Sequence, residues 1–374
     1  PTQTVRAVVR FHLKQVHPEL ELYASPLNID PAQPVMPIST PDDYSAELAA
    51  ATGRYYTQEM PEDTKVLSAG IFSRDEFLQQ ARLTADQFFE QYRYVLGNFE
   101  TGLLFYYFGN LDQTSHMLMK TLDPGHPAYD VNVDERYAHV IEDLYIELDA
   151  VVGYTLDNMP AGTKLVVMSD HGFTSWRRSF NLNTWLLENG YAVLENPNIR
   201  KDPGWLLNVD WSKTRAYGLG LNGLYLNLKG REKNGIVEPA DREALMREIA
   251  DKLLATLDPA TGEPAITKVY YREEVYKDRG HLELGPDLQI GYAKGTRGSN
   301  ESASGEFPAE VIVDNTEEWN GDHCMDHEAV PGILLTNEPL VRPAPSLKEL
   351  GASILAEFGV TEGFPVLESP APAG

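Results

Sequence analysis

The sequence has one cysteine, no long apolar run and few basic residues, and each of these features excludes some classes of protein. It contains one cysteine in 374 residues, Cys324, so it forms no internal disulfide and no site with several cysteine ligands. No apolar run approaches the roughly 20 residues that span a bilayer, and the chain opens without a signal-like segment. These features exclude a disulfide-rich scaffold and a membrane span, and they leave the compartment and the oligomeric state open.

Basic residues are also scarce. The chain has 31 Lys and Arg against 56 Asp and Glu, a formal net charge of −25. Such a surface repels nucleic-acid backbones and anionic lipid, so we expect neither a nucleic-acid polymer nor a membrane as a partner. A small phosphate ester is still compatible with this charge, because bound metal ions reverse the potential locally.

The apolar residues that are present, 42% of the chain, form patterns of an α/β protein. Two short, continuous apolar runs, Gly102 to Phe108 (GLLFYYF) and Lys164 to Met168 (KLVVM), are typical of strands covered on both faces of a parallel sheet. Between them, Arg136 to Leu156 has helical spacing, which completes a βαβ unit. The sequence therefore predicts a doubly wound, mostly parallel sheet with helices on both faces.

Further segments extend this alternation over a single domain, residues 1–374. The expected elements are a strand in Thr4 to Leu13, helices in 73–96, 240–257 and 346–358, and a strand in 332–335 (GILL). Residues 196–320 differ, because turns, aromatics and short alternating strands dominate them, and we expect an α+β elaboration beside the main sheet. Its glycine- and serine-rich patch GTRGSNESASGEF predicts a mobile loop.

Polar residues of the kind that bind metals follow both apolar runs. Asp112 and His116 come after GLLFYYF at a spacing of i, i+4. If a helix begins at Asp112, an acceptable N-cap, both side chains lie on one face and reach the same cation. A capping Asp and a surface His are the more common explanation of a lone DxxxH, so this spacing alone does not establish a metal site.

Asp170 and His171 come directly after KLVVM. Adjacent residues point apart in an extended loop, but a tight turn before Gly172 lets both side chains converge on a metal. The plainer interpretation makes Asp170 a turn residue and His171 a half-exposed side chain. Ligands of open parallel sheets bind beyond the carboxyl ends of the strands, so two such placements favour a binding site.

A third group lies in WNGDHCMDHEAVPGILLTN, before the last apolar run. His323 is the favoured ligand, although Asp322, Asp326 and His327 crowd it and spacing alone leaves the choice open. Cys324 is either a soft ligand or, as is more common, a small buried residue. The favoured set of Asp112, His116, Asp170, His171 and His323 suits zinc, or manganese or iron, better than calcium or magnesium.

In this order, LDQTSH, VVMSDHGF and GDHCMDHEAVPGILL resemble the alkaline phosphatase superfamily. The nearest branch is the type I phosphodiesterase/nucleotide pyrophosphatase family, and the resemblance covers roughly residues 20–360. It implies a two-metal phosphoester hydrolase in which Asp112, His116 and His323 hold one ion. Asp170 and His171 hold the other, together with an Asp from the first strand of the domain, and a Thr or Ser between the metals attacks phosphorus.

The early Asp and the nucleophile have no clear counterpart. Ser39 and Thr40 in VMPISTPDDY are candidates, because a Thr followed by Pro resembles the nucleophile loop of the family. However, no strand ending in Asp precedes them, and the interval to Asp112 is short. We interpret both as loop residues, keep Thr40 as a weak candidate, and expect the first strand–helix unit of the family to lie outside this sequence.

Other functions fit the sequence less well. A serine hydrolase using Ser169 is disfavoured, because triad residues come from separate elements and the G-x-S-x-G elbow is absent. The sulfatase motif C/S-x-P-x-R is missing, and the ligand set and inserted domain of phosphoglycerate mutases are not matched. One alternative is not excluded by the sequence. It is a catalytically inactive protein of the same fold that binds metal or serves as a binding module. Arg177 and Arg178 are interpreted as a solvated pair rather than phosphate ligands.

Overall fold

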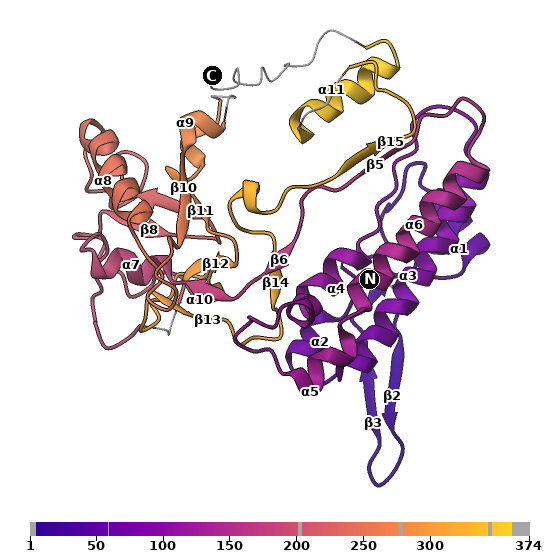
Figure 1. The fold of residues 1–374 in the computed structure, drawn as a ribbon, viewed down its shortest axis with the longest axis horizontal. Coiled ribbons are helices and arrows are strands. Elements are labelled where there is room, and N and C mark those ends of the chain that lie inside the picture. The colour runs from indigo at the N-terminus through magenta and orange to yellow at the C-terminus, as the bar shows by residue number, and fades with distance from the viewer. Residues whose placement is uncertain (1–4, 59, 201–203, 277–279, 343–345, 361–374) are drawn as a thin grey trace. The chain divides into compact units, whose positions relative to one another are not determined.

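A computed structural model describes residues 5–58, 60–200, 204–276, 280–342 and 346–360. The chain divides into two compact units (Figure 1). The first comprises residues 1–122, 130–163 and 317–319, and the second comprises residues 123–129, 164–316 and 320–374. Each unit has its own buried apolar clusters. The predicted arrangement of one domain with an elaboration at 196–320 stays a prediction.

The first unit is mainly helical. Its longest helix, α3 (Arg74–Gly97), confirms the helix predicted for 73–96. The helix begins at a capping box in which the Ser73 hydroxyl accepts the Glu76 N–H and the Glu76 carboxylate accepts the Ser73 N–H. The second predicted helix is α6 (Val140–Asn158). The other helices are α1 (Tyr44–Thr52), α2 (Thr64–Ser68), α4 (Asn110–Leu118) and α5 (Val131–Asp134), with short 3-10 turns at Met119–Leu122 and Glu135–Tyr137.

The N-terminal strand is divided in two. In place of one strand from Thr4, which lies outside the described residues, the chain forms β1 (Ala7–Val8) and β2 (Phe11–Gln15). β2 pairs with β3 (Glu21–Ala24) in an antiparallel hairpin that extends away from α2 and α5 in Figure 1, and β1 pairs with β4 (Asn28–Ile29).

The apolar run at 102–108 forms no strand of the described sheets. Its alternate residues Leu104, Tyr106 and Phe108 pack against Tyr92 and Leu96 of α3 and Val151 of α6. The residues between them, Leu103, Phe105 and Tyr107, are exposed. The expectation of a strand covered on both faces is therefore wrong for this run, since it has a helical layer on one side only.

The second unit contains the remaining strands. KLVVM forms β5 (Val166–Met168), as predicted, and GILL contributes to β15 (Leu334–Thr336). The two pair antiparallel, not in parallel. A second two-stranded sheet pairs β6 (Thr174–Ser175) with β14 (Gly321–Asp322). A three-stranded sheet has the order β12 (Thr296–Gly298), β7 (Arg178–Phe180) and β13 (Ile312–Asp314). A four-stranded sheet has the order β10 (Ile266–Tyr271), β11 (Leu288–Tyr292), β9 (Gly223–Leu226) and β8 (Ala216–Gly218).

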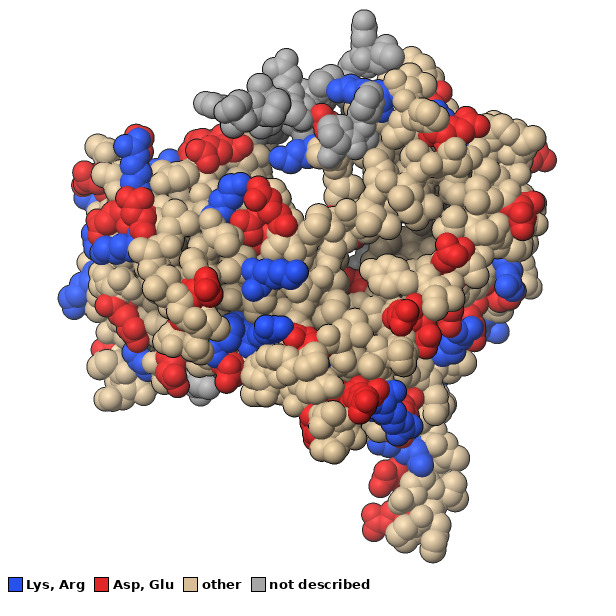
Figure 2. All heavy atoms as spheres, in the orientation of Figure 1, with Lys and Arg blue, Asp and Glu red and all other residues tan. Residues whose placement is uncertain are grey.

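Among the described strands, the only parallel pair is β7 with β12. The protein is thus of mixed α/β construction, and its small sheets do not by themselves form the doubly wound parallel sheet that the sequence predicts. None of the described helices is long and apolar enough to cross a membrane. On the face drawn in Figure 2, basic side chains lie among acidic ones, in keeping with the many ion pairs of this acidic chain.

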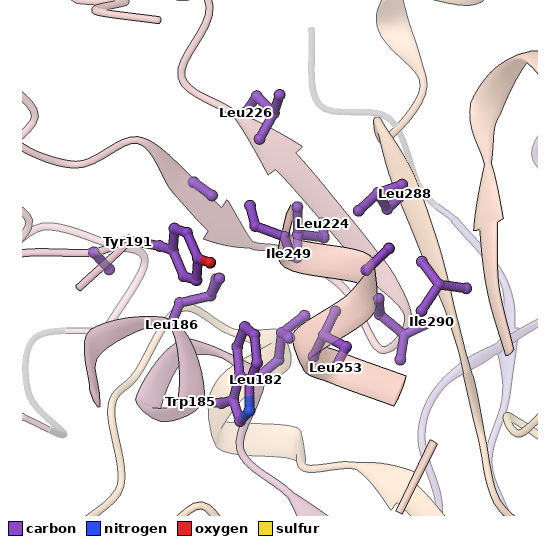
Figure 3. Close-up of a cluster of buried hydrophobic side chains, with 14 of the residues drawn as sticks. Leu182, Trp185, Leu186, Tyr191, Leu224, Leu226, Ile249, Leu253, Leu288 and Ile290 are labelled. Atoms are coloured by element: carbon purple, nitrogen blue, oxygen red, sulfur yellow. The ribbon is translucent and has the colours of Figure 1, made fainter. Parts of the chain in front are cut away.

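The main core of the second unit joins two helices to the four-stranded sheet (Figure 3). Trp185 and Leu186 of α7 (Leu182–Glu188) and Ile249 and Leu253 of α8 (Arg242–Leu254) pack with Leu224, Leu226, Leu288 and Ile290 of β9 and β11. Burying each of these side chains contributes about 1.5–3 kcal/mol. α8 confirms the helix predicted for 240–257, and α11 (Leu347–Glu357) confirms the one predicted for 346–358. A further short helix is α9 (Arg272–Val275).

The patch predicted to be a mobile loop is instead ordered and largely buried. It contains β12 and α10 (Asn300–Ala303), whose N-cap Ser299 accepts the Ser302 N–H. Gly298 lies so close to the backbone of Leu221 that an added Cβ would meet its carbonyl oxygen at 2.2 Å. The prediction was wrong because this glycine marks a close approach of two backbones, not flexibility.

Candidate metal centre

Asp112 and His116 lie one turn apart on α4, in the first unit. The helix begins at Asn110 with Gly109 as its N-cap, so Asp112 occupies the first turn and is not the cap that the sequence suggested. Its carboxylate is favoured there by the partial positive charge of the helix N-terminus. His116 Nε2 lies 3.5 Å from Asp112 Oδ2. That separation is long for a strong hydrogen bond, and it suits two atoms that share one cation.

The first unit buries the imidazole of His116. The ring lies against Trp319, with 3.9 Å between ring centroids. Asp112 Oδ2 also accepts a 2.8 Å hydrogen bond from the Gln113 side-chain amide. These contacts fix the orientation of both side chains, as the surroundings of metal ligands do.

Nearby, the carboxyl group of Glu62 is also buried in the first unit. Burial raises its pKa, and the negative charges of Asp112 and Asp63 raise it further, against hydrogen bonds that lower it, including that with Thr84. The first unit thus concentrates acidic groups around Asp112, which favours a cation there.

In the second unit, Asp170 and His171 follow β5 and converge as the sequence suggested. His171 Nε2 lies 3.4 Å from Asp170 Oδ2, whose side chain is 64% exposed and therefore accessible. His171 Nδ1 lies 3.0 Å from the Gly172 carbonyl, so it carries the hydrogen, and Nε2 presents the lone pair that a metal ion requires.

Gly172 makes this turn possible. An added Cβ would lie 2.4 Å from the Pro331 carbonyl oxygen, so no larger residue fits without moving the backbone. Ser169 secures the other side of the turn, since its hydroxyl accepts the Ile333 N–H at 2.9 Å. This contact gives Ser169 a structural role and agrees with the rejection of a serine nucleophile at this position.

His323 is brought beside His171 by a short ladder. β6 follows the Asp170–Gly172 turn and pairs antiparallel with β14, in the register Gly321 with Ser175 and Asp322 with Thr174. The rings of His171 and His323 are consequently stacked, with centroids 3.5 Å apart and 11° between their planes. Their ring nitrogens lie within 4.8 Å of each other, a spacing at which both can bind one metal ion.

Two of the residues that crowd His323 in sequence, Asp326 and His327, make other contacts. Asp326 caps the turn after it, and its oxygens accept hydrogen bonds from Tyr270, Thr267 and the Glu328 N–H. Burial alone would raise its pKa, but these hydrogen bonds outweigh burial and lower it. His327 is exposed near the Tyr270 ring.

Asp322, His323 and Cys324 also bring three possible ligand atoms together. However, Asp322 pairs with the Arg297 guanidinium, 2.8 Å from Nε to Oδ2, and a cation at that oxygen would compete with a buried positive charge. Burial, followed by the negative charge of Asp322, raises the pKa of the Cys324 thiol to about 12. The ion pair with Arg297 therefore disfavours a metal at this triplet, and Cys324 is half-buried, not the fully buried residue that the sequence favoured.

The remaining sequence candidates are placed as follows. The Ser39 hydroxyl donates to the Pro41 carbonyl and accepts the Ser45 N–H, which makes it part of the turn before α1. Thr40 next to it is exposed. Arg177 pairs with Asp123 and is exposed.

Arg178 is tied down more firmly than its neighbour. It binds both oxygens of Asp258 and also pairs with Asp314, with its side chain largely buried. The interpretation of the two arginines as a solvated pair is therefore wrong for Arg178, whose largely buried guanidinium has two carboxylate partners, whereas Arg177 is exposed as expected.

The sequence did not identify the buried pair of Arg297 with Asp322 or the contact of Trp319 with His116. Arg297 is 25 positions away from Asp322, inside the segment expected to be mobile. Trp319 belongs to the same WNGDHC segment as His323, and this proximity in sequence could have indicated that Trp319 lies near the candidate ligands.

Carboxylate–imidazole pairs held by rigid turns in a mixed α/β protein are typical of metal-dependent hydrolases. A family model for type I phosphodiesterase / nucleotide pyrophosphatase matches residues 24–323, which include Asp112, His116, Asp170, His171 and His323. The chain belongs to this family, a branch of the alkaline phosphatase superfamily whose members are metal-dependent hydrolases of phosphoric esters. No curated protein matches the chain.

Proposed function

We propose that the protein is a metal-dependent phosphoester hydrolase of the phosphodiesterase/nucleotide pyrophosphatase type that acts on a small phosphoester through two zinc ions. The stacking of His171 on His323, next to the accessible Asp170, is the observation that carries this proposal. Manganese or iron would suit the same donors. The proposal includes the doubly wound parallel sheet that the family implies.

In this proposal, Asp112, His116 and His323 hold one ion. Asp170 and His171 hold the other, together with a further carboxylate of the kind the family takes from its first strand. The ions would act as Lewis acids and stabilise charge on the phosphoryl oxygens. The chain contributes orientation, since the Gly172 carbonyl fixes the His171 tautomer and the Trp319 ring fixes His116. Thr40 stays a weak candidate for the nucleophile.

Hydrolysis of bis-p-nitrophenyl phosphate in the presence of Zn²⁺ tests this function, with p-nitrophenyl phosphate as the monoester comparison. Asp170→Asn should lower kcat/KM for the diester at least about 100-fold, because loss of a ligand removes several kcal/mol of charge stabilisation. Glu328→Gln, an exposed acid in the same segment as His323, is the control and should retain activity.

Metal content separates the main alternative from this proposal. Zinc that binds through the five residues without any turnover would support a catalytically inactive, metal-binding member of the same fold. Turnover that survives Asp170→Asn would contradict the proposed site.

A further inference from the structure

The loop that presents His323 is held by a buried carboxylate. Asp322 has 1% of its surface exposed, and its Oδ1 accepts the backbone N–H groups of His323, at 2.8 Å, and of Cys324, at 2.9 Å. The Met325 N–H closes the turn on the His323 carbonyl at 2.9 Å. The backbone on both sides of the His323 side chain is therefore fixed by one acidic residue and one tight turn.

Asp322 in turn is held by Arg297 of β12. Arg297 is 6% exposed, and its Nε lies 2.8 Å from Asp322 Oδ2, the oxygen that does not accept the backbone N–H groups. Trp176 covers the guanidinium plane, with 4.2 Å from Cζ to the ring centroid. Nη1 donates to Asn300 Oδ1 at 2.9 Å, which fixes the rotation of the fork.

A buried ion pair is weak evidence for stability as such, because desolvation offsets most of the attraction between the charges. In some proteins, such a pair instead selects one local conformation. Here the pair links β12 to β14, and β14 leads directly into His323, whose ring lies 3.5 Å from that of His171.

We propose that Arg297 is a positioning residue, which through Asp322 sets the backbone at His323 so that the imidazole is presented to a divalent metal ion beside His171. This inference rests on the proposed function, because it assigns His323 to a metal. It adds that the affinity of that metal depends on a guanidinium that does not touch it.

The second unit offers a matched control for this inference. Arg178 of β7, the strand next to β12, also forms a largely buried pair with an aspartate, Asp258, with Nε 2.7 Å from Oδ2. This pair does not involve the backbone of a proposed ligand. Lys in place of either arginine keeps the positive charge but loses the planar fork and the stacking.

The experiment compares Zn²⁺ affinity, measured by competition calorimetry, in wild-type protein, Arg297→Lys, Arg178→Lys and His323→Ala. Urea midpoints measure any general loss of stability. We expect Arg297→Lys to weaken Zn²⁺ about 10–100-fold, the usual effect of losing a partner behind a metal ligand, and Arg178→Lys to change it less than about twofold. Asp322→Asn is the second variant, because its side-chain oxygen still accepts the two N–H groups while the ion pair is lost.

Imidazole ¹⁵N spectra without metal give a readout that does not depend on zinc. Arg297→Lys should shift the His323 resonances, since the ring moves off His171, whereas Arg178→Lys should leave them unchanged. Equal Zn²⁺ affinities and unchanged His323 resonances in the two lysine variants would overturn the positioning role and leave the proposed function standing. Wild-type protein that binds no Zn²⁺, with His323 resonances still dependent on Arg297, would overturn the proposed function and keep the positioning of the ring.

Discussion

At the scale of single residues, Cys324 shows that the surroundings of a side chain decide its chemistry. The residue lies next to His323 in sequence, where a thiolate would be a strong zinc ligand. Burial and the neighbouring charge of Asp322 instead favour the neutral thiol, with a pKa of about 12. The side chain is therefore a neutral, half-buried thiol beside His323.

The reactivity of Cys324 provides a direct test. At pH 8, modification of the native protein by a disulfide reagent should be roughly three orders of magnitude slower than in urea, because unfolding returns the thiol pKa to about 8.5. Since the chain contains one cysteine, the signal has a single source. Asp322→Asn should speed the native reaction, and a native rate equal to the unfolded rate would refute the assignment.

Glu62 makes a second prediction at this scale. Burial, followed by the charges of Asp112 and Asp63, raises its folded pKa above the unfolded value. The native state then binds the proton more tightly, so the free energy of unfolding falls as pH rises from the unfolded pKa through the folded one. Glu62→Gln avoids this loss. It should be more stable than wild type at pH 8, with the difference narrowing towards pH 4.

Urea midpoints at several pH values, in the presence of EDTA, measure this effect. Glu90→Gln, at an exposed position of α3, is the control and should differ from wild type by the same small amount at each pH. A Glu62→Gln difference that does not depend on pH would show that Glu62 is ionised equally in both states.

The sequence could predict local geometry within this site. The i, i+4 spacing placed Asp112 and His116 on one helical face, and the turn before Gly172 predicted that Asp170 and His171 converge. It could not predict the support of Arg297 for Asp322, because no local pattern relates two residues from separate strands. Such pairs are fixed by tertiary packing, and periodicity does not record it.

At the scale of elements, Asp287 joins the four-stranded sheet to the segments around it. The side chain is fully buried just before β11, and Arg231, Arg242 and Arg272 all pair with it. Its oxygen also accepts the Leu226 N–H of β9 at 2.8 Å. One carboxylate therefore connects a strand, the helix α8 and the start of α9.

Removing the negative charge of Asp287 should strongly destabilise the folded protein. Asp287→Asn leaves three guanidinium groups with too little negative charge, which destabilises a folded protein by about 3–5 kcal/mol when the partners are buried. Glu273→Gln, a more exposed partner of Arg242 and Arg272, should cost about 1 kcal/mol or less. Urea unfolding measures the stability of both variants. Equal losses of stability would show that the buried ion pairs of Asp287 contribute no more than the exposed ones of Glu273.

The contribution of Asp287 to the free energy of unfolding depends on pH with the opposite sign to that of Glu62. Burial alone would raise the pKa of Asp287, but hydrogen bonds and charge from Arg231, the Leu226 N–H and Arg242 outweigh it and lower the pKa. Its contribution is therefore present above the unfolded pKa and is lost as pH falls through the folded pKa. The destabilisation by Asp287→Asn should accordingly diminish in acid.

Elements with a strong period were the most predictable. The helices α3, α6, α8 and α11 follow from the helical spacing of their apolar residues. The run at 102–108 and the patch around β12 were not predicted correctly. Whether an apolar run finds strand partners, or a glycine permits a close approach, depends on segments distant in sequence.

At the scale of the whole molecule, the division into two units predicts that each unit is stabilised by its own apolar cluster. The apolar cluster around Phe77 belongs to the first unit, and the larger cluster around Ile249 belongs to the second. Both side chains are fully buried, so truncating either one leaves a cavity within its own cluster. Phe77→Ala should cost about 3–5 kcal/mol and Ile249→Ala about 2–5 kcal/mol.

Hydrogen exchange followed by mass spectrometry can show how far each loss spreads. We expect Phe77→Ala to raise exchange in α3 and α4, and Ile249→Ala to raise it in α8, β9 and β11, since opening free energies follow contiguous cooperative segments. Leu83→Ala in α3 and Leu254→Ala in α8 are matched controls at exposed positions, and they should change little. If either core variant instead raised exchange uniformly over residues of both units, the chain would unfold as one cooperative body, and the two apolar clusters could not be treated as separate sources of stability.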